Sequence, residues 1–160
     1  MRVAVTGHMN LTTETEKLVE QALISELASC GEPHELTGIS CIARGADTVF
    51  AQAVVAIGGR LEVVLPSADY RQTKVKSDHA AQFDKLMSRA ERVHVGTSAT
   101  ADRAAYEEAN EVLLSSCDML FAIWDGMSGV DKGGTANVVK LAESRGLPVR
   151  IIWPTGARRD

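Results

Sequence analysis

The chain has 160 residues, of which 45% are hydrophobic and 24% charged, and its formal net charge is −4. This length predicts one domain over residues 1–160, and the composition is too apolar for an intrinsically disordered chain. No apolar run reaches the roughly 18–20 residues that span a bilayer, and a strand-like stretch follows Met1 almost directly. We therefore expect a cytoplasmic protein with no signal peptide and no membrane partner.

The distribution of charge and of metal-binding side chains excludes further classes. Basic residues are scattered except at Arg158 and Arg159, so a nucleic-acid partner, which needs a basic patch, is disfavoured. The three cysteines are odd in number and lack the spacing of metal ligands, and the four histidines are dispersed. We predict reduced cysteines, no metal site and no resident cofactor.

Short apolar runs alternate with helical patterns along the whole chain. We expect strands over 2–6, 35–42, 61–65, 92–95, 119–124 and 149–153. Between them we expect helices over 14–29, from 43–47 to 58–59, and over 77–90, 101–116 and 135–144. Thr13 and Glu16 predict a capping box for the first helix, and Pro66 predicts the end of the third strand.

Several of these strands are apolar on successive residues, as is typical of parallel strands buried on both faces. Their alternation with helices predicts an α/β fold: a three-layer, doubly wound, Rossmann-like sheet, mainly parallel, with helices on both faces. In such sheets ligands bind beyond the carboxyl ends of the strands, at the point where the strand order reverses. Three segments of the chain follow a strand and carry glycine or polar residues suited to such a site.

The first candidate segment follows the strand over 2–6. Gly7 lets the backbone turn tightly and approach a ligand, while Thr6, His8 and Asn10 offer hydrogen bonds. A simple turn is the alternative interpretation of Gly7.

The second candidate segment opens the helix after the second strand. Gly45 lies at a helix start, where free backbone N–H groups and the helix dipole favour an anion, and Arg44 could add a bidentate phosphate contact. Asp47 in the first turn would repel an anion while stabilising the helix start. A solvated Arg44 side chain is the alternative.

The third candidate segment, residues 125–135, lies between the most apolar strand and the last helix. Gly133 and Gly134 permit close backbone approach, and Thr135 can cap the helix while facing a phosphate. The segment matches neither the dinucleotide fingerprint GxGxxG nor the P-loop motif. Spacing alone therefore predicts an anion or phosphosugar cradle.

Two helical residues and several carboxylates complete the candidate site. Tyr106 and Asn110 are four residues apart and share one helix face, so they could stack on a base and read its edge, or simply pack in the core. Asp47, Asp69 and Asp125 are candidate carboxylates for acid–base chemistry.

Taken together, these segments resemble the SLOG superfamily, which includes the DNA-processing protein A domain and the Lonely-Guy hydrolases. The matching stretches are, in order, 3–8, 42–47, 63–66 with Tyr70, 106–110, 118–126, 133–135 and 146–149. The resemblance covers nearly the whole chain. It implies that a nucleotide, nucleoside or nucleotide-derived ligand binds in the cleft formed by these loops.

The resemblance implies less about catalysis. The Lonely-Guy hydrolases carry the motif Pro-Gly-Gly-x-Gly-Thr-x-x-Glu, whose glutamate serves the cleavage of an N-glycosidic bond. Aligning Gly134 and Thr135 with its Gly-Thr places Val138 where that glutamate belongs, and valine cannot accept a proton. Hydrolysis would then need Asp125 or Asp47 as a substitute.

A looser resemblance to nucleoside 2-deoxyribosyltransferases has the same limit, because residues 137–139 offer no nucleophilic glutamate. We therefore predict a small nucleotide-like ligand in a binding or sensor role. The alternative is an N-glycosidic hydrolase or transferase with Asp125 as its catalytic carboxylate. A homodimer is left open, because the apolar helix stretches near 49–57 and 138–142 could pack against a partner or cover the sheet.

Overall fold

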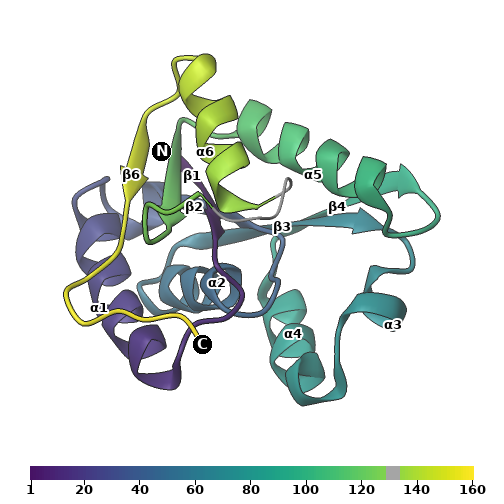
Figure 1. Cartoon of the computed structure of the whole chain (residues 1–160), viewed down its shortest axis with the longest axis horizontal. Coiled ribbons are helices and arrows are strands. Elements are labelled where there is room, and N and C mark those ends of the chain that lie inside the picture. Colours follow the sequence, from purple (N-terminus) through teal and green to yellow (C-terminus); the bar gives the residue numbers. More distant parts are fainter. Residues whose placement is uncertain (129–133) are drawn as a thin grey trace.

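The computed structural model describes residues 1–128 and 134–160 and contains a six-stranded sheet in the order β4-β3-β2-β1-β5-β6 (Figure 1). All the strand pairs are parallel. The strands are β1 (Arg2–Gly7), β2 (Thr37–Ser40), β3 (Arg60–Ser67), β4 (Arg92–Ser98), β5 (Met119–Ile123) and β6 (Val149–Ile151). The α-helices are α1 (Thr13–Ala28), α2 (Ala46–Ala56), α3 (Tyr70–Lys74), α4 (Ser77–Arg89), α5 (Arg103–Ser116) and α6 (Thr135–Ser144).

Helices cover both faces of the sheet, as predicted. Val3 and Val5 of β1 pack with α1 and α2, whereas Ala4, which points the other way, packs with α5 and α6. This alternation follows from the two-residue period of a strand. The α4 helix lies on the same face as α2, where Phe83 and Leu86 pack against β3 (Figure 1). The fold is therefore a three-layer Rossmann-like α/β fold.

The structure corrects the predicted boundaries at two places. The N-cap of α1 is Thr12, whose hydroxyl accepts a hydrogen bond from the Thr15 amide at 3.1 Å, so the predicted capping box at Thr13 is wrong by one residue. Pro66 does not end β3; the strand continues to Ser67 across a shift in its register with β4. A proline, which lacks an N–H donor, is tolerated at such an irregularity.

The segment after β3 contains a helix that periodicity did not predict. It was expected to be a polar loop as far as residue 77, but α3 occupies five of its residues. Tyr70, the first residue of α3, is buried against Phe83 of α4, with 6.1 Å between the ring centroids. The α3 helix is too short for a visible apolar stripe, and it depends on contacts such as this one and the pair between Arg71 and Asp84 of α4.

The apolar helix faces that left a homodimer open are buried within the chain. Val49 and Val54 of α2, and Val138 and Ala142 of α6, all pack in the hydrophobic core. These side chains cover the sheet, and the homodimer stays a prediction. Within residues 1–128 and 134–160, no helix is long and apolar enough to cross a membrane, and no group of three or more metal-ligating side chains gathers.

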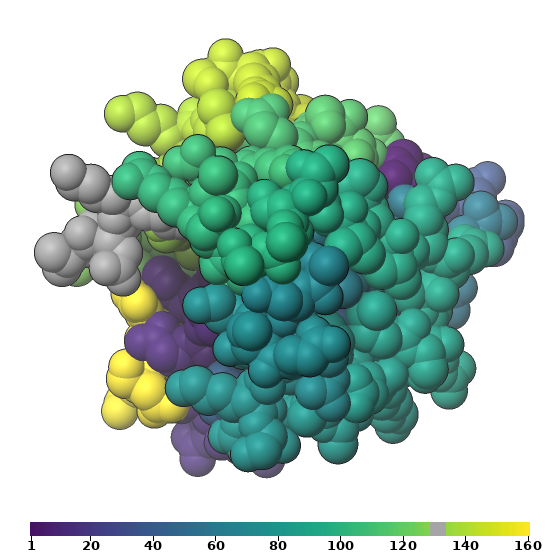
Figure 2. All heavy atoms as spheres, turned by 90° about the vertical axis from the view of Figure 1, so that its right-hand side faces the viewer, coloured from purple at the N-terminus to yellow at the C-terminus, as the bar shows by residue number. Residues whose placement is uncertain are grey.

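The last residues of the chain lie against the segment between β1 and α1, beside the carboxyl edge of the sheet. Leu11 pairs with Arg159 as an isolated antiparallel bridge, and the Thr12 amide donates to the Arg158 carbonyl at 3.4 Å. Figure 2 shows the last residues, in yellow, lying against the purple N-terminal segment. This contact brings Arg159 next to the loop that follows β1.

Candidate functional site

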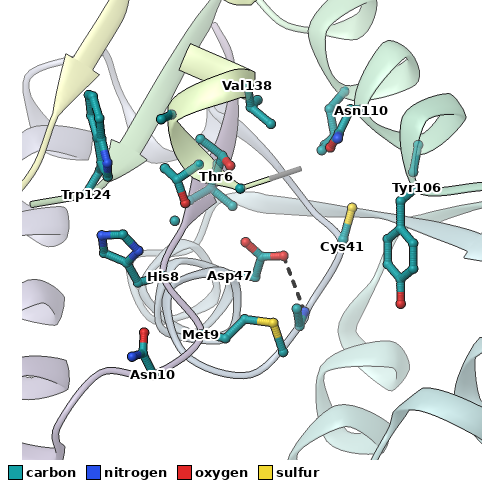
Figure 3. Close-up of a pocket in the computed structure, with 18 of the residues that line it drawn as sticks. Thr6, His8, Met9, Asn10, Cys41, Asp47, Tyr106, Asn110, Trp124 and Val138 are labelled. Carbon is teal, nitrogen blue, oxygen red and sulfur yellow. Dashed lines mark hydrogen bonds between the residues drawn. The ribbon is translucent and has the colours of Figure 1, made fainter. Parts of the chain in front are cut away.

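The strand order reverses between β1 and β5. From β1 the chain moves outward through β2, β3 and β4, and then returns to the other side of β1 with β5 and β6. Ligands in open α/β sheets bind at such a switch point, beyond the carboxyl ends of the strands. A pocket of about 510 Å³ lies at this position, between the loops after β1, β2 and β5 and the helices α5 and α6 (Figure 3).

Most of the predicted site residues line this pocket. They are Thr6, Gly7, His8, Asp47, Tyr106, Asn110, Gly134 and Thr135. They come from the end of β1, from α2 and α5 and from the start of α6, so residues far apart in the sequence meet in one place. Their roles in binding stay a prediction, because no ligand is present.

Gly7 is required at the base of the pocket by close packing. A β-carbon at this position would lie 2.5 Å from the Ala46 β-carbon and 2.7 Å from the Ile123 carbonyl oxygen. Gly7 pairs with Ile123 in the β1–β5 register, and the next amide, of His8, donates to the same carbonyl at 3.1 Å. The absence of a side chain lets α2 approach the junction of the two central strands.

The N-terminus of α6 faces the pocket without a side-chain cap. Gly134 is the N-cap, with no side chain to satisfy the first amides, and Thr135 is the first helical residue, 9% exposed. Free N–H groups and the helix dipole make such a terminus favourable for an anion. Val138, one turn further, also lines the pocket, at the position that the resemblance assigns to a glutamate.

Three predicted site residues lie outside the pocket lining, and a fourth, Gly133, lies outside the described residues. The Arg44 guanidinium pairs with the Asp78 carboxylate of α4 and is not among the lining side chains. Gly45 has φ +82° and packs against the loop after β1, where a β-carbon would meet the His8 carbonyl at 2.6 Å. Gly45 therefore allows the loop after β1 to pack closely against the segment that begins α2, outside the pocket lining.

Asp125, the predicted catalytic carboxylate, also lies outside the pocket lining and is held by three neighbours. Its Oδ1 accepts a hydrogen bond from the Met127 amide at 2.9 Å, and its Oδ2 lies 3.6 Å from Arg159. Its Oδ1 also lies 3.2 Å from Nε2 of His8. Desolvation acts to raise the pKa of Asp125, but hydrogen bonds from Met127 and His8 and the positive charge of Arg159 hold it below its usual value. Asp125 is thus a carboxylate that positions its neighbours.

His8 lines the pocket as a buried imidazole. Desolvation and the positive charge of Arg159 lower the pKa of His8, although Asp125 acts to raise it. The amide and the Oδ1 of Asp125 both lie 3.2 Å from Nε2 of His8, so this nitrogen can accept from the amide or donate to the carboxylate. Trp153 packs edge-on against the ring, with the centroids 5.7 Å apart. His8 is therefore a neutral hydrogen-bonding group at the pocket wall.

Replacing Arg159 with glutamine is expected to raise the pKa of His8, because one of the two effects that lower it is removed. An NMR titration of the His8 ring protons measures this directly. The matched control is Arg158→Gln, which removes the neighbouring positive charge and is expected to leave the His8 titration unchanged. An unchanged pKa of His8 in Arg159→Gln would contradict the assigned electrostatic contact.

The centre of the pocket holds a carboxyl group, a thiol and a phenol. Figure 3 shows Asp47 between His8 and Cys41. Burial raises the pKa of Asp47 to about 7, although the Ala43 amide, which donates to its Oδ2 at 3.4 Å, acts to lower it. Burial also raises the pKa of the Cys41 thiol and of the Tyr70 hydroxyl, and the charge of Asp47 adds to both shifts. These three groups are therefore close enough to interact.

An exposed aromatic ring flanks this centre. Tyr106 of α5 is 40% exposed and lies edge-on to the buried Tyr70, with the ring centroids 6.5 Å apart. Asn110, one turn along α5, lines the same wall (Figure 3). No hydrogen bond of the Asn110 side chain occurs within the described part of the chain. A planar heterocycle could thus stack near Tyr106 and meet an amide that can donate or accept.

Sequence reasoning did not assign a site role to Arg159, Met9 or Cys41, which all line the pocket. Cys41 was interpreted as a core thiol and Arg159 as part of a basic pair. Cys41 lies inside the predicted strand over 35–42, whereas β2 ends at Ser40 and leaves Cys41 directly after the strand. Arg159 left no such signal, because its place depends on the pairing of the last residues with Leu11.

No protein-family model and no curated protein sequence matches the chain. Three solved structures share its fold. DNA processing protein A from Streptococcus pneumoniae is 18% identical, with a TM-score of 0.69, over 97% of this chain and 51% of that one. The Helicobacter pylori protein of the same name is 15% identical, with a TM-score of 0.69, over 100% and 68%. The molybdenum cofactor carrier protein from Chlamydomonas reinhardtii is 19% identical, with a TM-score of 0.57, over 94% and 74%.

The chain thus spans about half the length of the Streptococcus protein. The Helicobacter structure describes a single-stranded DNA binding mode, which overturns the expectation that a nucleic-acid partner is disfavoured. The expectation failed because net charge averages over the whole surface, whereas single arginines and backbone N–H groups can hold phosphates locally. The predicted resemblance is confirmed at the level of the fold: the chain has the SLOG-type Rossmann-like fold of these proteins.

Proposed function

We propose that the chain binds a nucleotide or a nucleotide-derived small molecule in the pocket at the strand-order reversal. The observation that carries this proposal is the pairing, in one pocket, of an uncapped helix N-terminus with an exposed aromatic ring. The α6 terminus suits a phosphate, and Tyr106 suits a base. The volume of about 510 Å³ is within the usual range for small-molecule sites.

The phosphate would lie at the α6 N-terminus. The backbone amides that begin α6 and the hydroxyl of Thr135 are donors there, and among the described residues no side-chain hydrogen bond caps the helix. Arg159 adds the positive charge nearest to the loop after β1. Gly134, which has no side chain and lines the pocket, leaves space for the ligand to approach the backbone.

Binding without N-glycosidic cleavage fits the site better than hydrolysis. The α6 residue that would supply a glutamate is Val138, and Asp125 is held by Met127, His8 and Arg159 away from the pocket lining. Burial raises the pKa of the remaining carboxyl group, Asp47, to about 7, and Asp47 interacts with Cys41 and Tyr70. We therefore propose a binding or sensor role.

A single-stranded nucleic acid is the second candidate ligand for the same pocket. The structural likeness to a protein with a described single-stranded DNA binding mode supports it. Single strands are bound by aromatic stacking together with donors to the backbone phosphates, and Tyr106 and the α6 terminus supply both kinds of group.

A thermal-shift panel separates these candidates. The panel contains AMP, GMP, ADP-ribose, NAD, cyclic nucleotides, cytokinin nucleotides and an oligothymidine. A ligand at about one hundred times its Kd adds roughly 2.7 kcal/mol, which raises the midpoint by roughly 5–10 °C for a domain of this size. A shift with a mononucleotide supports the first candidate, a shift with the oligothymidine alone supports the second, and a flat panel would contradict both.

Replacing Thr135 with valine is expected to weaken nucleotide binding by roughly 5- to 20-fold, because a hydrogen bond to a charged phosphate is lost while the side-chain shape is kept. Isothermal titration calorimetry measures the change. Thr13→Val is the matched control, since Thr13 is the first residue of α1 and lies exposed outside the pocket. Equal affinities in the two variants would contradict a phosphate at the α6 terminus.

A further inference from the structure

We propose that the pocket selects a guanine-type heterocycle, in which a ring N–H lies beside an exocyclic amine, through the carboxylate of Asp47. This inference rests on the proposed nucleotide binding and names the class of base. Such an edge presents two adjacent hydrogen-bond donors to one carboxylate, and a carbonyl oxygen follows the ring N–H. Guanine nucleotides and reduced or oxidised pterins carry this edge, and guanosine monophosphate is the probe that tests it.

Asp47 is a carboxyl group without a compensating partner. Its only hydrogen bond within the described part of the chain is the long one that Oδ2 accepts from the Ala43 amide at 3.4 Å. No arginine, lysine or histidine of residues 1–128 or 134–160 forms an ion pair with it within 4.0 Å. Burying a carboxylate without partners is unfavourable, and two donors from a ligand would supply what the protein does not.

The geometry aims this group into the pocket. Asp47 lies in the first turn of α2, and its carboxylate lines the pocket wall between the side chains of His8 and Cys41 (Figure 3). The bond to Ala43 uses one lone pair of Oδ2 on the loop side. Each carboxylate oxygen has two lone pairs, so both oxygens can still accept from a ligand that enters past Met9, which is 59% exposed.

Tyr70 is a second unpartnered polar group at the same place. Its side chain is 6% exposed, its hydroxyl makes no hydrogen bond within the described part of the chain, and it interacts electrostatically with Asp47 and Cys41. Tyr70 also lines the pocket, so its hydroxyl is open to a ligand. A neutral phenol can donate to the carbonyl oxygen that follows the ring N–H of a guanine-type base.

The other common bases fit this pair of groups less well. Adenine and cytosine place an amine beside a ring nitrogen that bears a lone pair, which would face the second oxygen of Asp47 and repel it. Uracil and thymine offer one N–H between two carbonyl oxygens. A simple cationic amine would satisfy Asp47 but would leave the α6 terminus and Arg159 without an anion. A guanine-type nucleotide supplies donors to Asp47 and a phosphate to the α6 terminus and Arg159.

A ligand series on the unaltered protein tests the inference first. Isothermal titration calorimetry compares GMP with inosine monophosphate, which lacks the exocyclic amine, with xanthosine monophosphate, which has a carbonyl in its place, and with AMP. GMP is expected to bind roughly 10- to 100-fold more tightly than the other three, as a bidentate contact discriminates between bases. Equal affinities for GMP and AMP would overturn the inference and leave the proposed function standing. Absence of binding by all four would count against the proposed function itself.

Asp47→Asn provides the reciprocal test. Asparagine can accept from the ring N–H and donate to a carbonyl, so the variant is expected to lose at least about 10-fold in GMP affinity and to gain affinity for xanthosine monophosphate. The matched control is Asp84→Asn, an exposed carboxylate that pairs with Arg71 outside the pocket and is expected to change neither affinity. Unchanged GMP affinity in Asp47→Asn would overturn the inference. If this variant does not fold, the ligand series alone decides.

Discussion

Gly7→Ala is expected to destabilise the protein by about 3 kcal/mol, near the upper end of what overpacking a core costs. The new β-carbon would lie 2.5 Å from the Ala46 β-carbon, 2.7 Å from the Ile123 carbonyl oxygen and 2.9 Å from the Ile123 β-carbon. Both neighbours are fully buried, and none of these atoms is the end of a flexible side chain. The two central strands, or the start of α2, must therefore move. Urea unfolding followed by circular dichroism measures the loss.

The control for this prediction is Gly146→Ala, at the end of α6. Gly146 has φ +71° and no atom within 4 Å of an added β-carbon, so alanine there meets backbone strain alone, roughly 1–2 kcal/mol. Gly7→Ala is also expected to weaken ligand binding, because the displaced backbone forms the base of the pocket. A Gly7→Ala protein as stable as Gly146→Ala would contradict the close packing of α2 on the β1–β5 junction.

Asp47→Asn is expected to stabilise the free protein at pH 8 more than at pH 5. Burial raises the pKa of Asp47 to about 7 from 3.8, so the folded state favours the neutral carboxyl. A raised pKa of this kind contributes stability below the unfolded value, and that stability is lost as the pH rises through the folded value. Between pH 5 and pH 8 the loss amounts to at most about 3 kcal/mol, at 1.36 kcal/mol per pKa unit. Asparagine cannot ionise, so the variant does not lose this stability as the pH rises.

Urea unfolding of the two proteins at pH 5 and pH 8 measures this difference. The same pair of measurements on Asp84→Asn, an exposed carboxylate, gives the background change with pH. The expected result is a gain for Asp47→Asn at pH 8 that shrinks toward pH 5. A variant that is less stable than the unaltered protein at pH 8 would show that Asp47 has a stabilising partner when ionised. Such a result would also remove the physical basis for its selection of a base.

The fold was largely predictable because the hydrophobic periodicity of each strand and helix is present in its own stretch of sequence. The predicted strand over 2–6 and helix over 135–144 match β1 and α6 almost residue for residue. α3 was not predictable, because its five polar residues depend on the packing of Tyr70 against Phe83. Strand order likewise depends on which helix covers which face, a property of the assembled sheet.

Site residues were predictable where they end or directly follow a strand, or where they begin a helix. Thr6, Gly7 and Thr135 line the pocket for this reason. The directions of charged side chains were not predictable. Arg44 turns away from the pocket toward Asp78, a residue of a helix whose position no local pattern reveals.

The surroundings of Asp125 were not predictable from the sequence either. A carboxylate after an apolar strand resembles a catalytic group, but three neighbours hold it: Met127 from its own loop, His8 from β1 and Arg159 from the end of the described chain. Asp47 resembles an ordinary helix-start residue, and only the folded structure reveals that its carboxylate faces the pocket without a cation. The surroundings of each carboxylate therefore come from the fold, and the site roles of both stay predictions.

The most direct test of the central claim is a ¹⁵N NMR titration of the protein with GMP. If a nucleotide binds at the strand-order reversal with its phosphate at α6, the largest amide shifts are expected at Gly7, Gly134 and Thr135, with smaller ones along α5 near Tyr106. Residues of the opposite edge of the sheet, such as Glu35 and Arg60, are expected to stay unchanged. Shifts confined to surfaces away from this pocket, with Gly7 and Thr135 unmoved, would contradict the account.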